Sequence, residues 1–283
     1  MEYILILLMC IFVSAYMSLN RVFYKDNVRN TADLLYFNMS AFVIPALVFL
    51  PRVFDCSPAV WVYAALTAVF SVACFMLFTH TVLSGNLSLT TLIVNFAMVI
   101  NVLVSFLFFK EPLSTVRIAS ICMIVVAFVI GTDIHKPKGN RRWLAFAVGA
   151  LACASCACVV QKFFGASPYS EENFAFVSSY SLIVVAISLG IYMFVKKRED
   201  KTYKFDFYFA GYAVGIGVCL AAFQTIFTFC LARIDGTFLF PVQTGIMTIL
   251  SVISGLLIFK ARFSKRQFAG AVLAFISLVI MSY

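Results

Sequence analysis

Charged residues are scarce in this chain. They make up only 12% of the 283 residues, whereas hydrophobic residues make up 63%. A soluble domain is about 25% charged, so the composition excludes an ordinary soluble protein. The mean hydropathy of +1.03 instead indicates a protein that crosses a membrane many times.

Polar residues do not alternate with apolar ones in the hydrophobic segments, which excludes a β-barrel. A helix needs about 20 mainly apolar residues to cross the hydrocarbon core. Ten apolar runs between charges approach this length, and we expect each to be a transmembrane helix. The runs are 3–19, 34–50, 59–79, 87–109, 115–131, 143–163, 173–195, 207–231, 237–259 and 267–282.

Acidic residues are missing from the middle of every run, because all twelve fall in loops or at helix ends. Proton-coupled cation antiporters commonly carry a carboxylate inside the membrane. We therefore expect a neutral or zwitterionic solute, although aromatic side chains could hold a cation by cation–π attraction.

Signs of enzymatic or metal chemistry are also lacking. The two histidines, His80 and His135, lie at or beyond helix ends, and Cys153, Cys156 and Cys158 diverge around one helix, so no metal site is expected. No hydrolase, metal or nucleotide-binding motif occurs. We predict no enzyme activity, no cofactor and, because the basic residues lie in short loops, no nucleic-acid partner.

The sequence contains an internal repeat. Residues 85–130 recur at 235–280, with Phe109-Lys110 aligned on Phe259-Lys260. We predict one transmembrane domain, 1–283, made of five-helix repeats at 1–135 and 141–283. An odd number of helices per repeat requires inverted topology, and because one chain supplies both halves we expect a monomer.

Basic residues are unevenly distributed between the loops of the two faces. One face carries 16 of the 21, and the other carries only Arg52, Lys110, Arg117, Lys162 and Arg233. The positive-inside rule then places the basic loops in the cytoplasm and both termini outside.

Amides and hydroxyls supply the polarity inside the predicted helices. We selected eight of them as candidate substrate-binding residues: Tyr16, Asn20, Asn95, Asn101, Gln161, Gln224, Gln243 and Thr244. The alternative is that such amides only bridge helices. The repeat places Asn95 and Gln243 at similar depths, and Pro241 is expected to interrupt backbone hydrogen bonds just before Gln243.

The turn after the fourth predicted helix, Phe109-Lys110-Glu111-Pro112-Leu113-Ser114, resembles the EamA-type branch of the drug/metabolite transporter superfamily. Pro241, Phe259, Ser264 and Gly270 match the same pattern in the second half. The sequence departs from it where Ala261 replaces the second glutamate, Thr91 the first proline and Ala119 the first glycine.

This resemblance implies an all-α fold of ten transmembrane helices in two inverted repeats. It also implies alternating-access transport through a cavity lined by the first, third, fourth, sixth, eighth and ninth helices. Bacterial members resemble a plan with both termini inside, which conflicts with the charge distribution.

We therefore expect a secondary transporter of a small polar organic solute, such as a metabolite, an amino-acid-like molecule or an amine. It would lie in the lipid bilayer of a bacterial cytoplasmic membrane. A non-transporting membrane scaffold or lipid-handling protein is the alternative.

Overall fold

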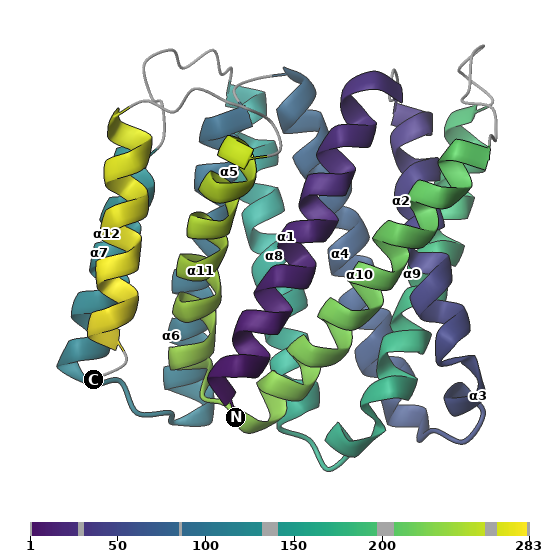
Figure 1. The fold of residues 1–283 in the computed structure, drawn as a ribbon. Coiled ribbons are helices and arrows are strands. Elements are labelled where there is room, and N and C mark those ends of the chain that lie inside the picture. Colours follow the sequence, from purple (N-terminus) through teal and green to yellow (C-terminus); the bar gives the residue numbers. More distant parts are fainter. Residues whose placement is uncertain are drawn as a thin grey trace.

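The computed structural model describes residues 2–27, 31–84, 87–131, 141–196, 207–257 and 265–281. Every regular element within these ranges is a helix (Figure 1). The α-helices are α1 (Glu2–Asn27), α2 (Thr31–Val48), α3 (Leu50–Val53), α4 (Pro58–Ser84), α5 (Leu87–Asn95), α6 (Ala97–Phe109), α7 (Thr115–Gly131), α8 (Arg141–Gly165), α9 (Asn173–Lys196), α10 (Phe207–Arg233), α11 (Gly236–Leu257) and α12 (Lys265–Met281). A short 3₁₀ helix, η1 (Ser170–Glu172), precedes α9.

All ten predicted apolar runs contain helix, and α7 has the bounds expected from the sequence. Two runs are divided, one between α2 and α3 and the other between α5 and α6. Among the described residues, seven helices are long and apolar enough to cross a membrane. The chain is a multi-pass, all-helical membrane protein.

The division between α5 and α6 falls at Phe96, next to a candidate binding residue, Asn95. The Phe96 N–H donates to the Ile93 carbonyl at 3.1 Å, and the Val99 N–H donates to the Phe96 carbonyl at 3.0 Å. These tighter, 3₁₀-type bonds replace the α-helical pattern for one turn. Helix α11, by contrast, continues through Pro241, which has no N–H to donate, so the segment that is divided into two helices is the one at Phe96.

Two glycines allow helices to approach closely. A Cβ atom at Gly217 would lie 2.6 Å from the Cβ of Ile44, which brings α10 against α2. A Cβ atom at Gly270 would lie 2.7 Å from the Ala127 carbonyl oxygen, which brings α12 against α7. Only a residue without a side chain permits either contact, as in other tightly packed membrane helices.

The helices stand side by side, and the beginning of α1 and the end of α12 lie at the same end of the bundle (Figure 1). Helix α8 packs against α4, α5, α6 and α10, whereas α7 and α12 form a pair at one edge that is attached mainly through α11. Both termini therefore lie on one face. Nine of the 21 basic residues used to predict the orientation lie outside the described residues.

Candidate functional site

Two cavities of about 440 and 480 Å³ lie among the helices. They adjoin, since both are lined by Asn95, Phe223, Gln224, Gln243 and Thr244. Among the described residues, no acidic or basic side chain lines either cavity, and the polar groups of the lining are amides, hydroxyls and thiols.

The structure brings together seven of the eight candidate residues predicted from the sequence. Four line both cavities, Asn101 and Gln161 line the first, and Tyr16 lines the second. These residues come from α1, α5, α6, α8, α10 and α11, which belong to both halves of the chain. The eighth, Asn20, is buried on α1 but lines neither cavity.

Three amide oxygens around the first cavity lack hydrogen-bond partners among the described residues. They belong to Asn101, Gln161 and Gln224, whose residues are 4%, 4% and 7% exposed. A buried acceptor without a donor costs about 1–3 kcal/mol. The terminal torsion of an amide side chain has a broad energy minimum, so each oxygen can turn toward a donor on a bound molecule.

Aromatic rings form much of the remaining cavity wall. Phe75 and Phe78 come from α4, Phe223 and Phe227 from α10, and Phe240 from α11. The rings of Phe223 and Phe227 are stacked with their centroids 5.5 Å apart. A mainly apolar wall with a few amides is the usual composition of a pocket for a small organic molecule.

The depth of the cavities follows from helix geometry, because each helical residue rises about 1.5 Å. Gln161 lies four residues before the end of α8, or about 6 Å along the helix axis. Tyr16 lies fourteen residues after the first residue of α1, or about 21 Å. The cavities therefore extend from near the end of the bundle that carries the termini to beyond its middle.

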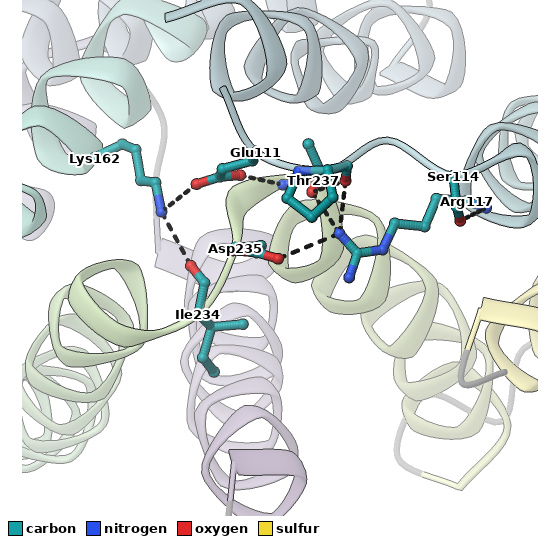
Figure 2. A network of polar contacts seen from close by, with 8 residues as sticks. Glu111, Ser114, Arg117, Lys162, Ile234, Asp235 and Thr237 are labelled. Carbon is teal, nitrogen blue, oxygen red and sulfur yellow. Dashed lines mark hydrogen bonds and ion pairs between the residues drawn. The ribbon is translucent and has the colours of Figure 1, made fainter. Parts of the chain in front are cut away.

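A buried ion pair lies just beyond the cavity at that end of the bundle (Figure 2). The Nζ of Lys162, the residue after Gln161, is 2.8 Å from Oε1 of Glu111, and their side chains are 8% and 9% exposed. Lys162 also donates to the carbonyl of Leu231 at 3.1 Å and to that of Ile234 at 3.0 Å. These carbonyls lie at the C-terminal end of α10, where a positive charge is favoured.

Glu111 bonds in turn to the start of α11. Its Oε2 accepts the backbone N–H of Thr237 at 2.9 Å, at a helix N-terminus that favours negative charge. Beside it, Arg117 donates to the Pro112 carbonyl at 2.8 Å and to Thr237 Oγ1 at 2.9 Å, and pairs with Asp235 at 3.3 Å (Figure 2). We call Glu111, Lys162, Arg117, Asp235 and Thr237 the closing network.

Sequence reasoning did not identify this network as part of a site. Its acids were expected in loops or at helix ends. Its two bases, Arg117 and Lys162, were expected on the same face of the membrane as Lys110, the face with few basic residues. The pairing of Glu111 with Lys162 has no local signal, because a helix and the linker between the halves separate them in the chain. Among the described residues, no group of three or more His, Cys, Asp or Glu side chains could hold a metal.

Comparisons with known proteins agree with this architecture. One crystal structure matches with a TM-score of 0.76 over 98% of both chains, at 17% sequence identity. This likeness concerns the fold. No curated protein matches the chain. The model of the EamA-like transporter family, within the drug/metabolite transporter superfamily, matches residues 1–131, so this part of the chain is similar to that family of membrane transporters.

Proposed function

We propose that this protein is a secondary transporter that moves a small polar organic solute across the cytoplasmic membrane by alternating access. The observation that carries the proposal is the pair of adjoining cavities, around which residues from both halves place amides with unpaired carbonyl oxygens. A helix-bridging amide would have its partner within the protein. These oxygens instead suit the hydrogen-bond donors of a solute.

The lining also bears on the charge of the solute. Because no acid or base of the described part of the chain lines the cavities, a molecule with a single fixed charge finds no counter-ion among these residues. A neutral or zwitterionic solute suits the amides and aromatic rings best. An amine could still bind with its cation over the face of a ring such as Phe223 or Phe227.

Alternating access requires two halves that move relative to each other, and the helix packing supports two inverted repeats. We infer ten membrane segments by joining α2 with α3 and α5 with α6. The contact of α4 with α8 is then equivalent to that of α10 with α1, and the contact of α4 with α9 to that of α10 with α2. The pairs α2 with α9, α6 with α11 and α7 with α12 each relate a segment to its own counterpart, as expected around a pseudo-twofold axis.

A ligand screen tests the proposal and identifies the solute at the same time. The purified protein is heated in detergent with members of a metabolite library, because a ligand that binds only the folded state raises the melting temperature with concentration. Hits are then tested for uptake into proteoliposomes. We expect at least one neutral, zwitterionic or amine solute to stabilise the protein and to be transported.

Variants of the lining test where the solute binds. Asn95→Ala and Gln243→Ala should abolish the thermal shift and the uptake. Thr67→Ala should preserve both, because Thr67 is buried on α4 outside the two cavities and its hydroxyl donates to the Tyr63 carbonyl of its own helix at 2.8 Å. Full uptake by both lining variants would contradict the site. A hit that binds in the cavities but is never transported would favour a scaffold or a lipid-handling protein.

A further inference from the structure

We propose that the closing network is a one-sided gate, with the Glu111–Lys162 ion pair holding the cavity shut at the end of the bundle that carries both termini. This inference rests on the proposed transport function and concerns how access to the same site is controlled. It starts from the position of Lys162. The residue before it, Gln161, lines the cavity, and Lys162 itself joins three separate chain segments.

The network joins the two halves of the protein. Glu111 and Pro112 belong to the turn between α6 and α7, and Arg117 lies in the first turn of α7, all in the first half. Their partners lie near the end of α8, in the turn between α10 and α11, and at the start of α11, all in the second half (Figure 2). An opening at this end must separate these segments, so it must break the ion pair.

Burial and the two helix ends strengthen the ion pair, so that it can act as a latch, meaning a contact that must break before this end opens. Both charged side chains are more than nine-tenths buried, so bulk water screens their attraction little. Each charge also faces the helix end that favours its sign, with Lys162 at the C-terminus of α10 and Glu111 at the N-terminus of α11. Separation therefore removes the ion pair and the hydrogen bonds to both helix ends together.

The opposite face lacks an equivalent acid in the sequence. The repeat aligns Glu111 with position 261, which is alanine, and Lys162 with Arg21. A base is thus present in both copies, whereas the carboxylate is present only in the first. Since Ala261 cannot form an ion pair, the repeat supplies no copy of the Glu111–Lys162 pair for the opposite end. The pair therefore favours the conformation closed on the face of the termini.

Thiol accessibility tests the gate directly, because Cys158 lines the first cavity. The other eight cysteines are replaced by alanine, and a membrane-impermeant maleimide is applied to each face of sealed proteoliposomes. A C-terminal tag identifies the face of the termini. We expect Cys158 to react from the opposite face and to be nearly unreactive from the face of the termini.

Loss of the ion pair should reverse this protection. Glu111→Gln keeps an acceptor for Thr237 but removes the charge, and Lys162→Met keeps the length of the side chain. Removing one partner leaves a buried charge uncompensated, so each should raise labelling from the face of the termini by at least about tenfold. The double variant Glu111→Gln/Lys162→Met leaves no buried charge, so it remains testable if a single variant fails to fold.

Lys110→Gln is the matched control, because it removes a positive charge from the same turn at an exposed residue outside the network. Its labelling should equal that of the unmodified single-cysteine protein. Labelling within about twofold of that reference in the double variant would overturn the gate. Faster labelling in a protein that transports no solute would support the gate and count against the proposed function, so the two failures are distinguishable.

Discussion

Replacing the unpaired amides should make the protein more stable and, at the same time, less able to bind its solute. The two changes are Gln161→Met and Gln224→Met, which keep the length of the side chain and remove its polar end. Most substitutions at buried positions destabilise a protein. We expect these two substitutions to raise stability instead, because the carbonyl oxygen of each glutamine is buried without a partner among the described residues.

The magnitude follows from the cost of an unsatisfied acceptor, about 1–3 kcal/mol. Methionine removes that cost and packs well against the neighbouring aromatic rings. We expect each variant to gain on the order of 1 kcal/mol in the free energy of unfolding. For a chain of roughly this size, that raises the melting temperature by about 2–4 °C. If the solute donates to these oxygens, its affinity should fall by about tenfold, since 1.4 kcal/mol corresponds to a factor of ten.

The assay is thermal unfolding of the purified variants in detergent, first without any solute. Asn173→Leu is the matched control, because Asn173 is equally buried but both ends of its amide are bonded. Its Nδ2 donates to the Thr225 carbonyl at 2.9 Å, and its Oδ1 accepts from the Thr228 hydroxyl. This substitution should lower the free energy of unfolding by about 1–3 kcal/mol.

A loss of stability in Gln161→Met and Gln224→Met as large as in Asn173→Leu would refute the reasoning. It would mean that these amides hold helices together, as Asn173 does. A gain in stability with unchanged solute affinity would confirm the predicted effect on stability and contradict the predicted effect on binding. The oxygens would then be unsatisfied but unused in binding.

Two further predictions concern packing and helix capping. Gly217→Ala should lower the free energy of unfolding by about 1–3 kcal/mol, because the new methyl group overlaps α2. Gly211 has open space around it, so Gly211→Ala should instead stabilise α10 by about 0.5–1 kcal/mol. Glu172→Ala should cost about 1–2 kcal/mol because the carboxylate accepts both the N–H and the hydroxyl of Ser57 at the start of α4, at 2.7 and 2.6 Å. Glu171→Ala, at an exposed neighbour, should change stability little. Thermal unfolding measures all four.

The helices were largely predictable because membrane crossing constrains them so strongly. Backbone groups in the hydrocarbon core must bond within their own segment, so apolar length alone predicted the bounds of α7 and came within a few residues of α8 and α9. The break at Phe96 was not predictable in this way. Neither proline nor glycine marks it, whereas Pro241, which the sequence singled out, lies within a continuous helix.

The cavity was more predictable from the sequence than the network that closes it. An amide in an apolar run stands out against its neighbours, and selecting such residues found seven that line the cavities. Asn20 shows the limit, because sequence spacing did not reveal that it lines neither cavity. Glu111 and Lys162 stood out less because charges are ordinary at helix ends, and only the folded chain brings them together.

The charge balance of the closing network has an electrical consequence. Glu111 and Asp235 offset Lys162 and Arg117, and within the described ranges the cavities are lined by uncharged residues. A membrane potential of 100 mV acts on one elementary charge with about 2.3 kcal/mol. Each half of the protein contributes one acid and one base to the network, Glu111 with Arg117 in the first half and Asp235 with Lys162 in the second. The potential therefore exerts no net force on the network charges of either half, even when the halves separate. Any voltage dependence that originates at this end of the transport path would therefore come from the charge of the solute itself.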